Sequence, residues 1–494
     1  MGISLLYLHE RKNHAHPLPD SVLYHLSLDR SFSRICADVK KRERFLSLLS
    51  DLTDDPDEIL YRQQILKDFE HNPTLMGELS SLSARFRELR LTQKTAGRDD
   101  LRLTATKTES AAASKNILET QALCLKRALL FVKAYGECLE GFDLRSQGLR
   151  EFLRSCKETC ENPDFDRLIT FCSKYETVSM GGYWNFRLGL NEEGAVEDCS
   201  LIDGRYIHVT DPDQKKKGFS LFKKEEQPDY PCQRISPTKD DLYERITRSA
   251  LSDLSALFGS ISEQIFERYG KIHEELPFYD TALRYIQAMR ERKIPLCYPT
   301  FTTDQSITVR NLYDLYLLMS APSPSEVIPN DFVMASESEG VLLLGNNGSG
   351  KTVYLRSVGS AQLLAQAGLP LPCTHAELTT FSHLATQFSE GEKEFCVGNE
   401  AGRFEQEVRA LATMVDTLQE NSLVLLNETF QSTAYAEGAE GLYHLLKHFS
   451  ALGIRWILVT HLGQLEDRLE ESDVTLLHTA EAYRILPKGK GEHP

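Results

Sequence analysis

The sequence predicts a multidomain protein in which long helices and a small β-rich insert precede an α/β domain with a mainly parallel sheet. Three observations support this prediction. The 494 residues exceed the length of one ordinary hydrophobic core. Apolar residues recur at helical spacing through the first 300 residues, except in a stretch near residues 181–238. Beyond that point, short apolar runs alternate with helical segments, which is typical of a parallel sheet covered on both faces.

The first part of the chain combines helical periodicity with a helix start. Apolar residues such as Phe45 and Leu48 lie three to four positions apart. Pro56 stands between acidic residues, and this combination is typical of the first turn of a helix. The stretch Thr92–Ser114 is poor in large apolar residues, and the sequence leaves open whether it is an exposed loop or a solvated helix. We therefore predict a helical region over residues 1–114.

A β-rich insert separates two further helical segments. Residues 115–180 and 239–300 carry apolar side chains at spacings of three and four, which predicts helices that run out and return. Residues 181–238 hold short aromatic and β-branched runs between turn residues, which predicts a small antiparallel sheet. The order helix, β insert, helix indicates an arm with a tip. A basic loop in the insert contains Lys215, Lys216, Lys217, Lys223 and Lys224.

The last segment, residues 301–494, is predicted to form the α/β domain. Three short apolar runs in it are strand candidates, namely Val341–Leu344, Ser422–Leu426 and Arg455–Val459. Long helical segments separate these runs. Continuous apolar runs of this length are typical of strands buried on both faces, so we expect a mainly parallel sheet.

Composition and charge restrict the class of protein. With 41% apolar and 26% charged residues, the chain is typical of soluble globular proteins. It has no apolar run long enough for a bilayer and no leader-like start, so we expect a cytoplasmic protein without membrane contact. Eleven scattered cysteines without a C-x-x-C pair indicate reduced thiols. The net charge of −16 argues against a broadly basic surface for nucleic acid, but it permits a local basic tip.

The most specific motif is a phosphate-binding loop. The pattern G-x-x-x-x-G-K-[ST] reads G-N-N-G-S-G-K-T over Gly345–Thr352 and directly follows the apolar run Val341–Leu344. The glycines let backbone N–H groups turn toward phosphate oxygens. Lys351 supplies a charge for the β- and γ-phosphates, and Thr352 offers a hydroxyl to Mg²⁺. The chain is therefore predicted to bind a nucleoside triphosphate.

Two later strand ends carry polar groups that suit hydrolysis of that nucleotide. Asn427 and Glu428 follow a buried strand, at the place where P-loop ATPases keep a Mg²⁺-linked acid and a catalytic Glu. Glu428 would be the general base that orients a water at the γ-phosphate. His461 ends the next predicted strand, where it could sense the γ-phosphate. Glu428 alone is more simply a solvated carboxylate, but the phosphate loop and His461 favour the catalytic interpretation.

These motifs resemble the ATPase domain of the DNA mismatch repair MutS family. The phosphate loop is followed by V-Y-L-R and later by A-Q-A-G-L-P-L-P-C over Ala365–Cys373. Val327–Asp331, read V-I-P-N-D, is similar to a family loop near the nucleotide base. Asn427-Glu428 followed by Thr433 resembles the family's D-E-x-x-x-x-T segment, and His461 ends a segment similar to its A-T-H. The resemblance is strong over residues 325–470 and weaker in D-P-D-E-I-L-Y-R-Q of the helical region.

The resemblance implies ATP and Mg²⁺ as cofactors and a pair of chains joined through their ATPase domains. It also implies a helical core (1–114), lever helices (115–180 and 239–300), a clamp-like insert (181–238) and a P-loop ATPase domain (301–494). Thr352 and Asn427 would hold Mg²⁺. The nucleotide contacts are expected from Gly345, Asn346, Asn347, Gly348, Ser349, Gly350, Lys351, Thr352, Val353, Ile328 and Asn330.

The chain also departs from the family pattern. Asn427 replaces the usual Asp, which substitutes a neutral oxygen for a charged one beside Mg²⁺. Gly402–Glu405 replaces the Ser-Thr-Phe-Met signature that reaches the partner's nucleotide. The mismatch-reading domain that the family places at its N-terminus is not found, so we expect no mismatch reader. The Phe-x-Glu tripeptide of that domain occurs at Phe86–Glu88 and Phe388–Glu390, and we attribute both matches to chance.

Two functions from different classes remain. The first is a slow, dimeric, MutS-like ATPase that clamps double-stranded DNA without reading its sequence, through the basic loop of the insert. The second is a nucleotide-switched assembly factor that contacts protein and binds DNA weakly or not at all. The resemblance favours the first, whereas the acidic balance and Asn427 favour the second.

Overall fold

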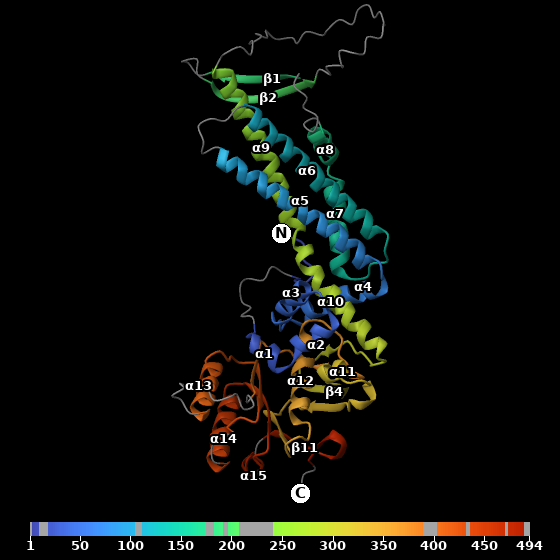
Figure 1. Ribbon diagram of the computed structural model, residues 1–494, viewed down its shortest axis with the longest axis vertical. Helices are drawn as coiled ribbons and strands as arrows, with labels where there is room; N and C mark the ends of the chain where they lie inside the picture. The colour runs from blue at the N-terminus through green and yellow to red at the C-terminus, as the bar shows by residue number, and fades with distance from the viewer. Residues whose placement is uncertain are drawn as a thin grey trace, which may run out of the picture. The chain divides into compact units, whose positions relative to one another are not determined.

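The computed structural model describes residues 2–8, 18–103, 111–173, 182–190, 196–206, 241–388, 403–430, 435–469 and 473–488. The chain divides into two compact units. The first contains Gly77–Phe142 and Glu151–His273 with the first residues up to Ile3, and the second contains Ser4–Met76, Asp143–Arg150 and Glu274–Pro494. Figure 1 labels the helices and some of the strands of the two units.

The first unit is built on long helices that share an aromatic core. Phe86 contacts Phe131, Tyr135 and Phe266, with ring centroids 4.9–5.9 Å apart. Aromatic side chains bury large areas, so this cluster joins helices that are far apart in sequence. The helices of the first unit are α5 (Leu75–Leu103), α6 (Ala111–Glu140), α7 (Gln147–Cys160), α8 (Phe165–Ser173) and α9 (Asp241–Tyr269). The predicted helices of this region are confirmed, and the undecided stretch is helical as far as Leu103 and again from Ala111.

The predicted antiparallel strands are present between α8 and α9. Strand β1 (Gly182–Leu190) pairs antiparallel with β2 (Val196–Tyr206), with an irregularity between Asn185 and Phe186. The lysine-rich loop at residues 215–224 lies outside the described residues. Its expected role therefore stays a prediction.

The second unit begins with short helices. These are α1 (Asp20–His25), α2 (Leu28–Ile35), α3 (Val39–Leu49) and α4 (Pro56–His71). The predicted start of α4 is confirmed, because Pro56 occupies its first turn and the Asp55 carboxylate accepts a hydrogen bond of 3.0 Å from the Asp57 amide. Helix α10 (Lys271–Glu291) belongs mainly to this unit.

A six-stranded sheet forms the centre of the α/β domain. Its strand order is β12-β11-β6-β10-β9-β8, and every neighbouring pair except β11 and β12 is parallel. The three predicted strands are confirmed as β6, β10 and β9, which lie side by side. The bounds are β6 (Gly340–Leu344), β8 (His383–Phe388), β9 (Ser422–Asn427), β10 (Arg455–Thr460), β11 (Val474–Thr479) and β12 (Ile485–Pro487).

Helices cover both faces of this sheet, as the continuous apolar strands predict. On one face, Val424 and Leu458 belong to a buried cluster with Leu442 and Phe449 of α14 (Tyr435–Ala451). The same face carries α13 (Arg403–Val415) and α15 (Gln464–Leu469). The other face is covered by α12 (Lys351–Gln366), in which every residue from Ser357 to Gln366 is buried.

A close approach fixes the position of α12. A Cβ atom added at Gly359 would lie 2.5 Å from a methyl carbon of Leu425 in the sheet and 2.6 Å from one of Leu26 beyond α1. Any larger side chain would therefore push the helix away from one of its two neighbours. The helix that follows the phosphate loop is thus wedged between the sheet and the N-terminal helices.

A second sheet was not predicted from the sequence. It has the order β3-β7-β4-β5 and is mostly antiparallel. Its strands are β3 (Thr300–Phe301), β4 (Ile307–Leu312), β5 (Asn330–Met334) and β7 (His375–Leu378). The remaining elements are α11 (Leu315–Ser320) and the short 3₁₀ turns η1 (Pro324–Glu326) and η2 (Glu481–Tyr483).

The described cysteines agree with the expectation of reduced thiols. Cys36, Cys124, Cys138, Cys156, Cys160, Cys172, Cys297 and Cys373 are all free. Burial raises the pKa of the Cys124 thiol to about 11 and that of Cys373 to about 12, so both remain protonated and unreactive at neutral pH. Among the helices in the described ranges, none has the length and apolar character that a membrane crossing requires.

Candidate nucleotide site

The phosphate loop connects β6 to α12, as its sequence context predicts. Gly348 and Gly350 adopt positive φ angles of 78° and 94°, which turn the backbone in a way that residues with a Cβ rarely adopt. Gly350 is also the N-cap of α12, so the first free N–H groups of the helix face the loop. Asn346, Asn347 and Gly348 at the tip are exposed. The loop therefore presents accessible backbone donors to an anionic ligand.

Lys351 is buried within this loop, with a relative exposure of 4%. Its Nζ donates to the carbonyl oxygens of Gly345 and Asn346 at 2.7 and 2.9 Å. It also lies 3.2 Å from Oε1 of Glu428. A positive charge is thus fixed at the centre of the loop, and a phosphate that binds there would compete with Glu428 for it.

Thr352 and Asn427, the two expected Mg²⁺ ligands, lie together. The Thr352 hydroxyl donates to Oδ1 of Asn427 at 2.9 Å, and Thr352 itself is exposed at the start of α12. A hydroxyl that donates its proton in this way still offers its lone pairs, and hard cations such as Mg²⁺ prefer oxygen ligands. The oxygens of these two residues fit a Mg²⁺ site, which Thr352 and Asn427 would hold.

Glu428 and His461, the two expected catalytic residues, are in direct contact. His461 Nδ1 lies 2.8 Å from Oε2 of Glu428, while the other carboxylate oxygen faces Lys351. The Glu428 backbone has a φ angle of 52°, in the left-handed region that residues with a Cβ avoid. Its N–H donates to Val459 O at 2.9 Å, which ties it to β10. The strand ends of β9 and β10 therefore place a carboxylate beside the phosphate loop.

The loop expected near the nucleotide base is fixed by the C-terminal hairpin. Asn330 donates through Nδ2 to Tyr483 O at 3.1 Å, and its Oδ1 accepts from the Ile485 amide at 2.8 Å. Ile328, the other residue expected here, is half-buried. Tyr483 itself is 61% exposed, and its Cδ1 lies 3.4 Å from the point that a Cβ of Gly350 would occupy. Sequence reasoning missed Tyr483, because only the fold brings it to the phosphate loop.

A second pair that the sequence did not predict lies directly after Glu428. The Thr429 hydroxyl donates to Oε1 of Gln387 at 2.6 Å. Both residues are buried, Thr429 completely. They stand 42 positions apart, and each is unremarkable in its own segment, so no local signal marks the pair.

Other residues singled out in the sequence either lie outside the described residues or are held in packing contacts. Gly402 and the side chains of Arg403 and Phe404 lie outside what the structure describes. Phe86 is buried in the core of the first unit and Phe388 stacks on His25, so both aromatic residues are occupied in packing.

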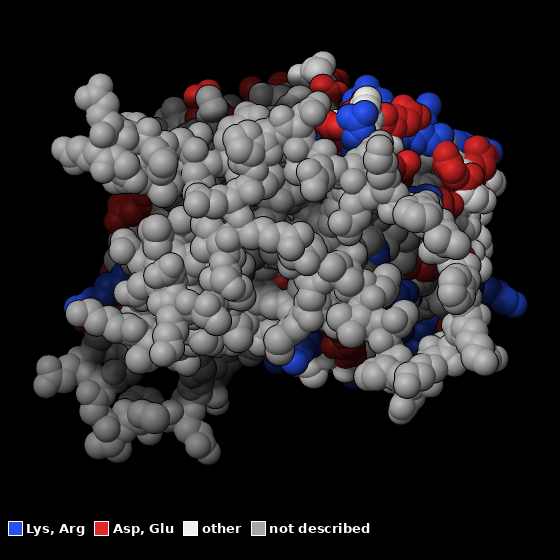
Figure 2. All heavy atoms as spheres, turned by 90° about the horizontal axis from the view of Figure 1, so that it is seen from above, with Lys and Arg blue, Asp and Glu red and all other residues white. Residues whose placement is uncertain are grey.

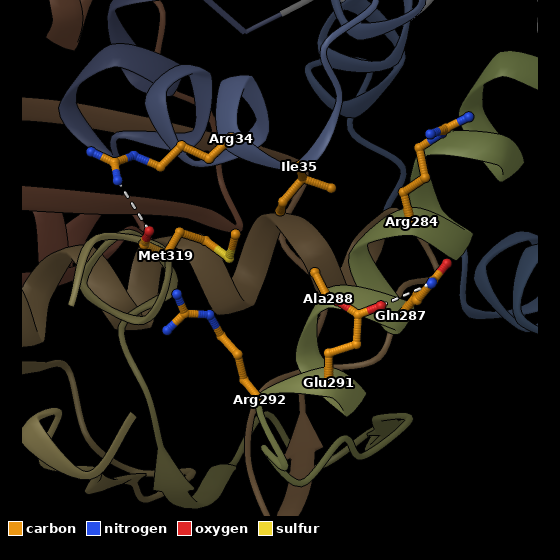
Figure 3. A pocket seen from close by; sticks show the side chains of 8 residues that line it. All are labelled: Arg34, Ile35, Arg284, Gln287, Ala288, Glu291, Arg292 and Met319. Atoms are coloured by element: carbon orange, nitrogen blue, oxygen red, sulfur yellow. Dashed lines mark hydrogen bonds between the residues drawn. The ribbon is translucent and has the colours of Figure 1, made fainter. Parts of the chain in front are cut away.

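A separate hollow of about 310 Å³ lies in the second unit and shares no residue with the nucleotide site. Figure 3 shows its walls, where Arg34 donates to Met319 O at 3.1 Å and Gln287 donates to the Glu291 carboxylate at 2.9 Å. Its lining consists of Arg34, Ile35, Arg284, Gln287, Ala288, Glu291, Arg292 and Met319.

Two family models match the chain. The model of MutS domain V matches residues 341–483, which contain the phosphate loop and both catalytic candidates. The model of the MutS2 N-terminal domain matches residues 54–292, which extend from α4 to the end of α10. Together the two models cover most of the chain.

Similar curated proteins carry the same family names. The chain is 27% identical over 217 residues to "Endonuclease MutS2" of Shouchella clausii, covering 44% of this chain and 26% of that protein. It is 23% identical over 456 residues to "DNA mismatch repair protein MutS" of Rhodopirellula baltica, covering 83% of this chain and 47% of that protein. The chain thus spans between about a quarter and a half of these two relatives.

Proposed function

The chain belongs to the MutS family, and from this premise we propose that it binds ATP with Mg²⁺ and hydrolyses the ATP slowly. The observation that supports the proposal best is the contact chain from Lys351 through Glu428 to His461 beside the phosphate loop. A buried lysine 3.2 Å from a strand-end carboxylate, and a histidine 2.8 Å from the same carboxylate, are groups that suit phosphoryl transfer to water. ATP turnover, measured with and without DNA, tests it.

Each residue of the site would have its own role in ATP hydrolysis. The loop N–H groups and Lys351 would bind the phosphates and stabilise the charge that develops in the transition state. Bound Mg²⁺ would supply positive charge to the phosphate oxygens, held by Thr352 with Asn427 behind it. When Lys351 binds phosphate, Oε1 of Glu428 would orient a water and accept its proton. His461 would hold the other carboxylate oxygen, so that the base stays in position.

Asn427→Asp is expected to lower, several-fold, the Mg²⁺ concentration that gives half-maximal turnover. The substitution keeps an oxygen where Thr352 donates and adds a negative charge beside the cation, and hard cations favour charged oxygen ligands. A Mg²⁺ titration of ATP hydrolysis measures the effect. Asn421→Asp is the matched control, because Asn421 occupies a left-handed turn before β9 and adds the same charge away from Thr352. Equal Mg²⁺ requirements for Asn427→Asp and the parent would assign Asn427 a purely structural role.

We further propose that two chains pair through their ATPase domains and clamp double-stranded DNA. In this arrangement the helices of residues 115–180 and 239–300 act as levers from the helical core, residues 1–114, and the insert 181–238 acts as the clamp. The names of the relatives, an endonuclease and a DNA mismatch repair protein, support this choice. The mass of the protein in solution with ATP and Mg²⁺ checks the pairing.

DNA affinity is expected to fall steeply with salt and to be equal for matched and singly mismatched duplexes. Each neutralised phosphate contributes about −0.9 to the slope of log K against log salt. Replacing Lys215, Lys216 and Lys217 by Ala should therefore reduce the slope by about 3 units. Gel-shift titrations at several salt concentrations measure this, with the exposed Lys40→Ala as control. A marked preference for the mismatched duplex would contradict the expectation that no mismatch is read.

The second candidate, a nucleotide-switched assembly factor, is favoured by the charge of the chain. Its net charge is −16, and on the face shown in Figure 2 the described basic side chains are interspersed with acidic ones. Such mixed charge gives phosphates little net attraction. No gel shift even at low salt, together with normal ATP turnover, would select this candidate.

A further inference from the structure

We propose that Gln387 and Thr429 form a positioning pair that holds Glu428 in the orientation needed for catalysis. The inference rests on the proposed ATPase function. Neither residue belongs to the phosphate loop or touches Lys351 or Thr352 through any described hydrogen bond. Thr429 is the residue that directly follows the proposed base Glu428 in the sequence, and Gln387 lies in the neighbouring strand β8.

The backbone around Glu428 needs support from its surroundings. Glu428 has a φ of 52° and Phe430 a φ of 62°, so two of three consecutive residues adopt the left-handed conformation. Residues with a Cβ keep this conformation only when neighbouring contacts enforce it. On the N-terminal side, the Glu428 N–H donates to Val459 O at 2.9 Å. On the C-terminal side, Phe430 packs against the buried cluster that includes α14, and the Thr429 hydroxyl donates to Gln387.

This second contact is short and buried. The Thr429 hydroxyl donates to Gln387 Oε1 at 2.6 Å, while Thr429 is 0% and Gln387 is 9% exposed. A buried hydroxyl that loses its acceptor is costly, so the bond fixes the Thr429 side chain and with it the peptide that follows Glu428. The carboxylate of Glu428 therefore depends on anchors from two different strands, β10 and β8.

Strand β8 is itself anchored on its opposite face. Alternate residues of a strand point to opposite sides, so Thr386 and Phe388 lie opposite Gln387. Both contact His25 at the end of α1. His25 Nδ1 lies 2.8 Å from the Thr386 hydroxyl, and its ring is stacked on Phe388 with centroids 5.0 Å apart and 1° between the planes. β8 is an edge strand of this sheet, and α1 packs on one of its faces through these side-chain contacts.

The pairing of β8 with β9 connects the position of β8 to that of Glu428. Gln387 is paired with Leu426 and Phe388 with Asn427 across β8 and β9, so Gln387 lies level with the end of the strand that leads into Glu428. A shift of β8 would move the acceptor of Thr429 and release the peptide that follows Glu428. We expect the phosphate loop to stay in place, because β6 and α12 hold its two ends. Loss of the pair should therefore lower kcat and leave ATP affinity unchanged.

The test compares Thr429→Val with Thr429→Ser. Val keeps the shape of the side chain and removes the hydroxyl, whereas Ser keeps the hydroxyl. We expect Thr429→Val to lower kcat at least about tenfold, which corresponds to about 1.4 kcal/mol, with ATP affinity within about twofold of the parent. Thr429→Ser should recover most of the rate. Gln387→Leu should lower kcat similarly, and the double variant with Thr429→Val should be no slower than either single one.

Three outcomes would contradict the proposed positioning role of Gln387 and Thr429. These are an unchanged kcat in Thr429→Val, a Ser variant as slow as Val, or additive losses in the double variant. Should Thr429→Val not fold, Gln387→Asn replaces it, because that change withdraws the acceptor by one methylene and the same losses are expected. A parent protein that binds ATP without turning it over would instead overturn the proposed ATPase function itself, so the two failures are distinguishable.

Discussion

Lys351→Ala is expected to weaken ATP binding by at least a hundredfold. The lysine is 4% exposed and fixed at the centre of the phosphate loop, where its Nζ contacts the carbonyl oxygens of Gly345 and Asn346. Hydrogen bonds to charged groups contribute roughly 1.5–3 kcal/mol each, so the loss of two phosphate contacts costs about 3 kcal/mol or more. That free energy corresponds to about a hundredfold in affinity. Equilibrium binding of a fluorescent ATP analogue measures it.

Lys447→Ala is the matched control for this variant. Lys447 also pairs with a glutamate, Glu339, at 3.4 Å, but it lies outside the phosphate loop. Removal of Lys447 should leave ATP affinity unchanged, because a partly exposed ion pair of this kind contributes little even to stability. Undiminished ATP affinity in Lys351→Ala would contradict the assignment of the phosphate loop.

Glu428→Gln is expected to reduce turnover by about 10²- to 10⁴-fold, the usual contribution of a general base. ATP binding should be kept and can even tighten. The carboxylate lies 3.2 Å from Lys351 and so competes with phosphate for its charge, whereas an amide competes weakly. Single-turnover hydrolysis gives the chemical rate, and equilibrium binding of ATP to the same variant gives the affinity.

The control for this variant uses the same surface ion pair. Glu339→Gln removes a carboxylate that also faces a lysine, and it should change neither rate nor affinity. Hydrolysis by Glu428→Gln at the parent rate would leave the proposed site without its base. Weaker ATP binding in Glu428→Gln would show instead that the contact with Lys351 organises the loop for the nucleotide.

The parts of the fold that the sequence predicted are those with strong local signals. Val341–Leu344, Ser422–Leu426 and Arg455–Val459 are continuous apolar runs, and all three are strands of the mainly parallel sheet. The glycines and lysine of the phosphate loop are similarly recognisable, because their spacing alone fixes the backbone path. Asp55-Pro56 marked the start of α4 through capping and proline geometry that act within one turn.

Features that depend on distant contacts could not be predicted in this way. The second sheet pairs β7 with β3 and β4 across more than sixty residues, and its strands are short, with mixed polar and apolar faces. The hydrogen bonds of Asn330 to the hairpin at Tyr483 span 153 positions. Gln387 and Thr429 carry no motif, and only the order of the strands brings them together.

The wedged position of α12 decides where a reporter group can be attached. From Ser357 to Gln366 the helix has no solvent-facing side, and at Gly359 even a methyl group would collide with Leu425 and Leu26. A fluorophore or spin label attached between Ser357 and Gln366 would disrupt the packing of α12. Asn347, exposed at the tip of the phosphate loop, is the neighbouring position where a label can be carried without repacking the interior. Spectroscopy of nucleotide binding should therefore observe the loop rather than the helix.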